Sequence, residues 1–103
     1  MNLREKQSKF VRLVVELILF AEANGYELTF GDAYRSKDCS HGHPNSLHRK
    51  RLAIDFNLFR DGKYLRATED HAPLGQFWES LGGSWGGRFG DGNHYSLEHR
   101  GMR

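Results

Sequence analysis

Near the start of the chain, apolar residues recur at steps of three and four, which is the period of an amphipathic helix. The pattern covers residues 5–24, and Asn24-Gly25 supplies a suitable C-terminal stop. The stripe consists of Phe10, Leu13, Val14, Leu17, Ile18 and Ala21. Val11, Val15 and Leu19 widen it, so we expect this helix to pack deeply against the rest of the fold.

Further along, apolar and polar residues alternate, which predicts strands rather than helices. The clearest case is residues 52–59. One face carries Leu52, Ile54, Phe56 and Leu58, and the opposite face carries Ala53, Asp55, Asn57 and Phe59. Shorter strands are expected over residues 26–33, 64–66 and 94–97. Asp61-Gly62 lies between the strands expected over residues 52–59 and 64–66, and it favours a tight hairpin turn.

A second helix is expected over residues 68–81, with Thr68 as its candidate N-cap. Residues 36–45 and 82–92 are rich in polar side chains or glycine, which predicts loops. The elements together indicate an α+β fold, in which a small antiparallel sheet packs against two or three helices. A chain of 103 residues has the size of one domain, so we expect residues 1–103 to form a single domain.

Composition narrows the class of protein without identifying it. Hydrophobic residues make up 38% and aromatic residues 13% of the chain, which suits a folded domain and argues against disorder. The net charge of +2 permits an anionic partner but does not require one. Cys39 is the single cysteine, so no internal disulfide can form and the fold depends on its core or on a metal.

The sequence shows no signal peptide and no membrane-spanning segment, because Arg12 and Glu16 interrupt the apolar run over residues 11–21. We therefore expect synthesis and folding in a cytoplasm, without insertion into a membrane. A substrate outside that compartment, in a periplasm or cell wall, would be reached only after another factor releases the protein.

Asp55 raises the first question of chemistry, because a carboxylate among apolar strand neighbours costs free energy unless it is paired or bound to a cation. An ion pair with a nearby arginine is one explanation. The other adds His48, seven residues earlier, and His94, at the expected start of the last strand. Two imidazoles and one carboxylate from separated segments are typical of a catalytic zinc site, which leaves the fourth position for water.

Two segments resemble one known family: Ser46-x-His48, with Asp55 seven residues later, and Asp91-x-x-His94. That family is the zinc D-alanyl-D-alanine carboxypeptidases, which include VanY-like and VanX-like enzymes and the L-alanyl-D-glutamate endopeptidases of phage endolysins. The fold of hedgehog signalling domains is similar to theirs. The resemblance covers residues 25–99 in the same order. It extends to Tyr34-Arg35-Ser36, Leu74-Gly75-x-x-Trp78, Leu81-Gly82 and Trp85-Gly86-Gly87.

The resemblance implies a peptidase that holds one Zn2+ per chain with His48, Asp55 and His94. It assigns the general base to Asp91, and it assigns substrate binding and transition-state stabilisation to Arg35. An Asp base in place of Glu is similar to the phage endolysin branch, so the implied reaction is hydrolysis of peptidoglycan stem peptides at the L-alanyl-D-glutamate bond. The sequence departs from many family members at Arg51, where they have glycine.

Two further residues are candidates for the substrate side of the site. Trp85 stands in the glycine-rich segment before Asp91, where it could line the cleft or simply pack. Ser46 is a candidate for steadying a metal ligand, although an ordinary turn residue explains it more simply. Arg35, taken without the resemblance, fits a surface ion pair equally well. For Phe77 and Trp78, the helical context favours core packing.

The remaining histidines and the basic cluster are less informative. Cys39-Ser40-His41-Gly42-His43 has the residue types of a metal site, but a polar loop bordering the cleft explains it better. His71 and His99 have no partners at ligand spacing and are expected at the surface or at helix ends. Arg49-Lys50-Arg51 is expected to be a solvated face with a loose attraction for anionic wall polymers.

Three other functions compete with the endopeptidase. The nearest is a D-Ala-D-Ala carboxypeptidase with the same metal site. A catalytically silent zinc-binding module, of the kind that hedgehog domains exemplify, is disfavoured by Asp91. A small phage nuclease is suggested by Asn93-His94 and the basic cluster, but the second catalytic histidine of a ββα hairpin is missing from the pattern. We therefore expect a peptidoglycan peptide as substrate, no nucleic-acid partner and a monomer.

Overall fold

The first helix, α1 (Leu3–Ala23), begins at a capping box. The Asn2 side chain accepts a hydrogen bond from the Glu5 backbone N–H (2.8 Å), and Glu5 accepts one from the Asn2 backbone N–H (3.0 Å). This computed structural model describes residues 1–31 and 50–99. The helix therefore starts two residues before the expected position, and it ends at the predicted stop, where Asn24 is the C-cap.

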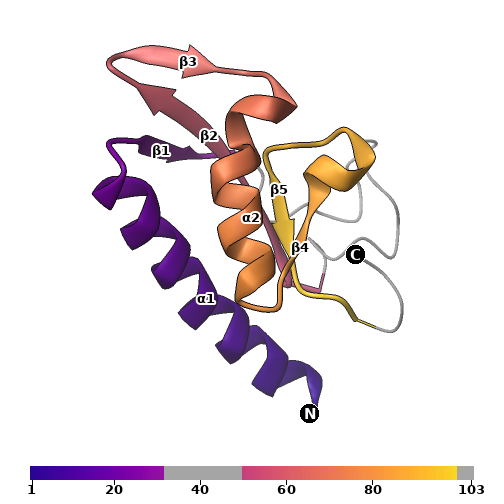
Figure 1. Ribbon diagram of the computed structural model, residues 1–103. Coiled ribbons are helices and arrows are strands. Elements are labelled where there is room, and N and C mark those ends of the chain that lie inside the picture. Colours follow the sequence, from indigo (N-terminus) through magenta and orange to yellow (C-terminus); the bar gives the residue numbers. More distant parts are fainter. Residues whose placement is uncertain (32–49, 100–103) are drawn as a thin grey trace.

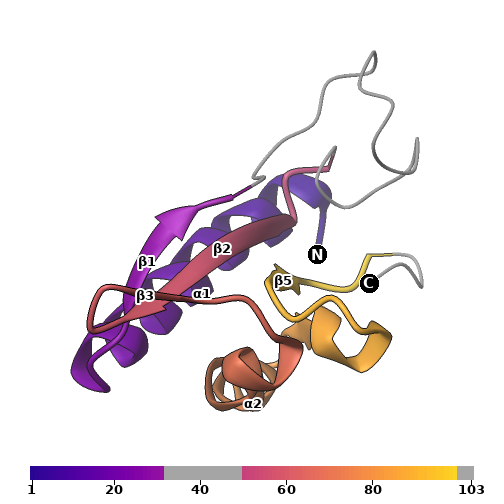
Figure 2. The same ribbon diagram turned by 90° about the horizontal axis from the view of Figure 1, so that it is seen from above.

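Only one stripe of α1 is buried. Phe10, Leu17 and Ala21 are in the core. The expectation that Val11, Val15 and Leu19 also pack inward is wrong, because these side chains are 62%, 49% and 58% exposed. The helix forms an outer layer against the sheet and α2 (Figures 1 and 2), so residues on its far side find nothing to pack against.

Within residues 1–31 and 50–99, five short strands form one antiparallel sheet, with the order β1-β2-β5-β4 and β3 paired to β2. The strands are β1 (Glu27–Phe30), β2 (Ala53–Arg60), β3 (Lys63–Leu65), β4 (Ser84–Trp85) and β5 (His94–Ser96). The second half of β2 pairs with β1 on one edge and with β3 on the other, while its first half pairs with β5. β2 is thus the strand that joins both halves of the sheet (Figure 1). The α+β class is confirmed.

The alternation along β2 is confirmed. Ile54, Phe56 and Leu58 are buried in the core shared with the helices, and Asp55 and Asn57 lie on the opposite face. The predicted hairpin is also present. Arg60 pairs with Lys63, and the two residues between them, Asp61 and Gly62, both have positive φ (52° and 77°), as a two-residue turn of the favoured type requires.

The second helix differs from its prediction because it is built in two pieces. A 3-10 helix, η1 (Thr68–His71), leads into α2 (Ala72–Ser80). Thr68 is not the N-cap, because Ala67 holds that position. The backbone N–H of Ala67 donates to the carboxylate of Asp70 at 3.2 Å. The Thr68 hydroxyl instead donates to the carbonyl of Gly90 at 3.3 Å. This bond ties the start of the helix to the segment that carries Asp91.

The glycine-rich segment over residues 82–92 is also more regular than predicted. It contains β4 and a second 3-10 helix, η2 (Gly86–Phe89). Trp78 of α2 anchors the strand that follows this segment, β5, because its indole N–H donates to the Ser96 carbonyl at 2.9 Å and its side chain is fully buried. The expected core role of Trp78 is confirmed, and Phe77 stacks on Phe20 with ring centroids 4.1 Å apart. No helix within the described ranges is long and apolar enough to cross a membrane.

The two sides of α1 offer a direct test of this packing. Leu17 is fully buried, so Leu17→Ala should lower the free energy of unfolding by about 2–5 kcal/mol. Leu19→Ala removes the same atoms from a side chain that is 58% exposed, and it should change the free energy of unfolding by less than about 0.5 kcal/mol. Urea denaturation measures both. Equal losses would mean that the outer stripe is covered in solution.

Candidate metal and catalytic site

Asp55 and His94, which are far apart in the sequence, face each other across neighbouring strands. They are direct partners in the pairing of β2 with β5. Backbone hydrogen bonds join Phe56 to Asn93 (2.9 Å) and Leu97 to Leu52 (2.9 Å). Since bonded and non-bonded pairs alternate along the ladder, Asp55 and His94 form a pair without backbone hydrogen bonds between them. Side chains approach each other most closely at such pairs. The His94 Nδ1 and Asp55 Oδ1 atoms are 3.2 Å apart.

Glycines occupy the next position on either side of this pair. Gly31 follows β1 and donates its N–H to the Asp55 carbonyl at 2.7 Å. Gly86 follows β4 and lies beside His94, since Trp85 pairs with Tyr95. A Cβ at Gly86 would lie 2.3 Å from the Asp91 carbonyl oxygen and 2.6 Å from the His94 Cβ. The row Gly31–Asp55–His94–Gly86 therefore presents one carboxylate and one imidazole, with no side chain on either flank.

The backbone holds Asp91 one turn before His94. The Asp91 N–H donates to the Gly86 carbonyl at 2.9 Å, and the Asp91 carbonyl accepts the His94 N–H at 3.2 Å. Such a bond over three residues closes a turn whose ends lie within about 7 Å of each other. The Asp91 side chain is exposed. The sequence therefore folds so that the candidate base and two candidate metal ligands lie on one small area of the surface.

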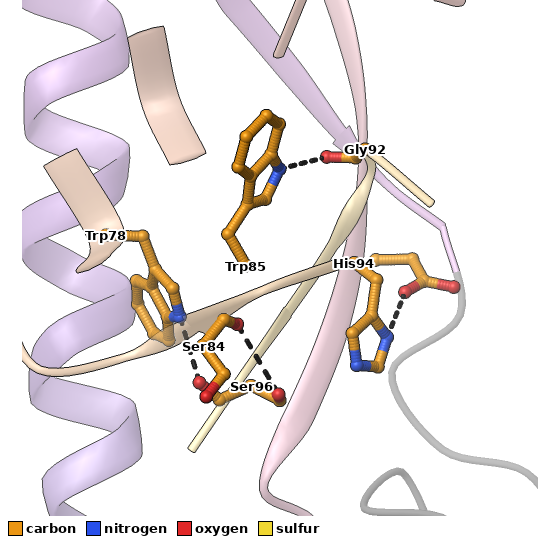
Figure 3. Close-up of polar contacts among 7 residues, drawn as sticks. Trp78, Ser84, Trp85, Gly92, His94 and Ser96 are labelled. Atoms are coloured by element: carbon orange, nitrogen blue, oxygen red, sulfur yellow. Dashed lines mark hydrogen bonds and ion pairs between the residues drawn. The ribbon is translucent and has the colours of Figure 1, made fainter. Parts of the chain in front are cut away.

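Trp85 is a buried anchor beneath this turn. Its side chain is only 7% exposed, and the indole N–H donates to the Gly92 carbonyl at 2.8 Å (Figure 3). Glycines admit the ring on two sides, because a Cβ at Gly75 or Gly87 would come within 2.1 or 2.2 Å of it. Trp85 is therefore packed, and the packing fixes the segment that carries Asp91. Its role toward the substrate stays a prediction.

A pocket of about 270 Å³ opens beside Asp91. β3 and β5 pair with different parts of the same edge of β2, and they leave a gap between them. The pocket lies in this gap. Asn57, which follows Asp55 on the same face of β2, contributes to its wall. The remaining lining comes from Phe56, Tyr64, Leu65, Arg66, Thr68, His71, Gly90, Gly92 and Asn93. The pocket is therefore continuous with the candidate base.

His71 corrects the expectation that it is a surface residue. It does stand at the start of α2, but its side chain is only 2% exposed, and its Nδ1 lies 2.8 Å from the Tyr95 hydroxyl. Burial lowers the pKa of His71, and Asp70 offsets part of this effect. Burial raises the pKa of the Tyr95 hydroxyl. The sequence offered no signal for this contact. His99 lies 3.1 Å from the Lys6 ammonium.

Several candidate residues lie outside the described ranges: Arg35, Cys39, His41, His43, Ser46 and His48. Within residues 1–31 and 50–99, no three His, Cys, Asp or Glu side chains come together as a metal site. Asp55 and His94 nonetheless fit as two ligands of one ion. Ligands at zinc distances in tetrahedral geometry are about 3.3 Å apart, and the two facing atoms are 3.2 Å apart.

Comparison with models of known protein families gives a match. A family model described as D-alanyl-D-alanine carboxypeptidase matches residues 39–97, more than half of the chain. The match spans His48, Asp55, Asp91 and His94 and begins after Arg35. No curated protein sequence matches the chain.

Gly86→Ala tests whether the glycine flank positions the site. The new Cβ would collide with His94 and Asp91, so we expect a loss of roughly 1–3 kcal/mol in stability together with changed NMR shifts of the His94 ring. Gly83→Ala is the matched control. Its Cβ would collide as closely, at 2.1 Å, with Trp78, and it should destabilise the protein while leaving the His94 ring shifts near their wild-type values. An unchanged His94 ring in Gly86→Ala would refute the prediction.

Proposed function

The chain belongs to the D-alanyl-D-alanine carboxypeptidase family, and from that premise we propose that it is a zinc peptidase that hydrolyses peptidoglycan stem peptides. The peptidase class and a peptide substrate follow from the family. The zinc, the bond that is cut and the roles of single residues are our proposal. One observation carries it most: β2 and β5 bring Asp55 and His94 within 3.2 Å, with Asp91 one turn away.

His48, Asp55 and His94 would hold the zinc ion, with a fourth position open to water. When bound, zinc supplies a Lewis acid for the scissile carbonyl and lowers the pKa of the attacking water. The Asp55–His94 pair is well suited to this role because both side chains are mostly buried and come from paired strands. Ligands on regular elements are held more rigidly than ligands on loops.

Asp91 would act as the general base. It would accept the proton of the attacking water and then deliver it to the leaving amine. Aspartate is one methylene shorter than glutamate, so its backbone must lie closer to the reaction centre. The two backbone hydrogen bonds of Asp91, to Gly86 and His94, supply that restraint. Arg35 would stabilise the oxyanion or bind a substrate carboxylate, and Ser46 would steady a ligand.

We assign the reaction to the L-alanyl-D-glutamate bond because an aspartate at position 91 is similar to the phage endolysin branch. Such an enzyme would act on the cell wall after release from the cell that makes it. D-Ala-D-Ala carboxypeptidase activity is the second candidate, favoured by the description of the matching family. Digestion of purified muropeptides separates the two by product mass: the first cuts between L-Ala and D-Glu, and the second frees D-Ala.

Metal dependence is the first prediction of this proposal. Protein purified with added zinc should contain about one zinc per chain and should reduce the turbidity of permeabilised bacterial cells. A chelator should abolish this lysis, and added zinc should restore it, because the ion supplies the Lewis acid. Lysis that persists after all metal is removed would show that the reaction does not use zinc.

The role of Asp91 gives a second prediction. Asp91→Asn removes the base with almost no change of shape, so the rate of hydrolysis should fall about 10²–10⁴-fold while zinc stays bound. His48→Ala should lose both zinc and activity. Asp61→Asn is the matched control, because it makes the same chemical change in the hairpin turn, where asparagine tolerates the positive φ of 52°. Near-normal turnover in Asp91→Asn would rule out the assignment of the base.

A further inference from the structure

One nitrogen of His71 is buried without a partner among the residues that the structure describes. The side chain is 2% exposed, and its Nδ1 is hydrogen-bonded to the Tyr95 hydroxyl at 2.8 Å. The Nε2 atom makes no hydrogen bond to any residue in the ranges that the structure describes. Because buried polar atoms are almost always satisfied, an unpaired one calls for a partner from outside the protein. The ring lines the 270 Å³ pocket beside Asp91.

The hydrogen-bond network assigns the proton to Nε2. Tyr95 is fully buried, and its phenolic O–H is a donor that needs an acceptor once it is removed from water. Within the part of the chain that the structure describes, its one acceptor is Nδ1 of His71, at 2.8 Å. Burial also lowers the pKa of His71, which favours the neutral ring. A neutral ring that accepts at Nδ1 carries its proton at Nε2, and Nε2 is the edge left for the pocket.

The rest of the pocket is already ordered by its own contacts. Asn57 donates to the Thr29 hydroxyl at 3.2 Å and accepts from the Tyr64 hydroxyl at 3.5 Å. The Arg66 guanidinium carbon lies 5.8 Å from the centre of the Tyr64 ring. Arg66 is exposed, so its positive charge stands at the rim. The His71 N–H donor is therefore on a buried wall, with a cationic rim outside it.

We propose that this pocket binds one residue of the peptide substrate next to the bond that is cut, and that the Nε2–H of His71 donates a hydrogen bond to an oxygen of that residue. The inference rests on the proposed function and deepens it. A volume of about 270 Å³ suits a single residue, since pockets for whole drug-sized ligands start at about 300 Å³. The acceptor is a peptide carbonyl or a side-chain or α-carboxylate, and Arg66 at the rim suits either.

Two substitutions test the two ring nitrogens of His71 separately. His71→Asn places an amide near Nδ1, so it keeps an acceptor for Tyr95 but removes the donor from the pocket. His71→Gln places an amide near Nε2, so it keeps the donor but gives up the Tyr95 contact. We expect His71→Asn to raise KM about tenfold with kcat within about twofold of wild type. His71→Gln should lower Tm more than His71→Asn but keep KM near the wild-type value.

The opposite order would overturn the inference: if His71→Gln raises KM and His71→Asn does not, the histidine serves only its contact with Tyr95. Each variant is assayed with a stem peptide that carries a free α-carboxylate at the residue beside the cut and with the same peptide amidated there. A larger KM effect on the free acid identifies a carboxylate as the acceptor, and equal effects identify a peptide carbonyl.

Activity of the wild-type protein shows whether a negative result concerns the proposed function or only the pocket. If it cuts neither peptide, the proposed function fails. If it cuts them and binds zinc normally while both His71 variants retain the wild-type KM, only the pocket assignment fails. Zinc content, measured for every variant, shows whether a change in KM comes from loss of the metal.

Discussion

The register of β2 against β5 is the constraint on which the rest of this structure depends. A shift by one residue would turn every side chain of β5 to the other face of the sheet. His94 would then point into the core and Tyr95 toward the surface. The core prevents this, because Tyr95 is fully buried against Trp78 and Phe56, and because Trp78 donates to the carbonyl of Ser96. The apolar face of the sheet thus fixes the position of the polar face.

On the polar face of the sheet, the backbone is held in place on both sides of His94. Two tryptophans are packed against glycines, Trp85 against Gly75 and Gly87, and Trp78 against Gly83. Their indole N–H groups bond to the backbone on either side of His94, at Gly92 and Ser96. The segment with Asp91 is therefore restrained by buried aromatic anchors as well as by its own turn. These contacts hold the backbone of Asp91 in place, which the general-base role proposed for it would require.

The same core connects the two parts of the candidate site. Tyr95 follows His94 in β5, and its hydroxyl reaches His71 at the start of α2. Thr68, at the other end of η1, bonds to the carbonyl of Gly90. One end of η1 is thereby tied to β5 and the other end to the segment before β5. The pocket between them is a consequence of strand order, because β3 and β5 share one edge of β2 and leave a gap between them.

The sequence by itself determined what depends on neighbouring residues. The alternation over residues 52–59 placed Asp55 opposite the apolar face, Asp61-Gly62 predicted the hairpin, and the spacing of Asp91 to His94 matched a family motif. Only the tertiary structure decided what depends on distant contacts. It left Val11, Val15 and Leu19 exposed, placed the N-cap at Ala67 instead of Thr68, and buried His71. Periodicity shows which residues share a face of a helix or strand. Packing between segments that are remote in the chain decides which faces are covered, and strand register decides that Asp55 and His94 meet.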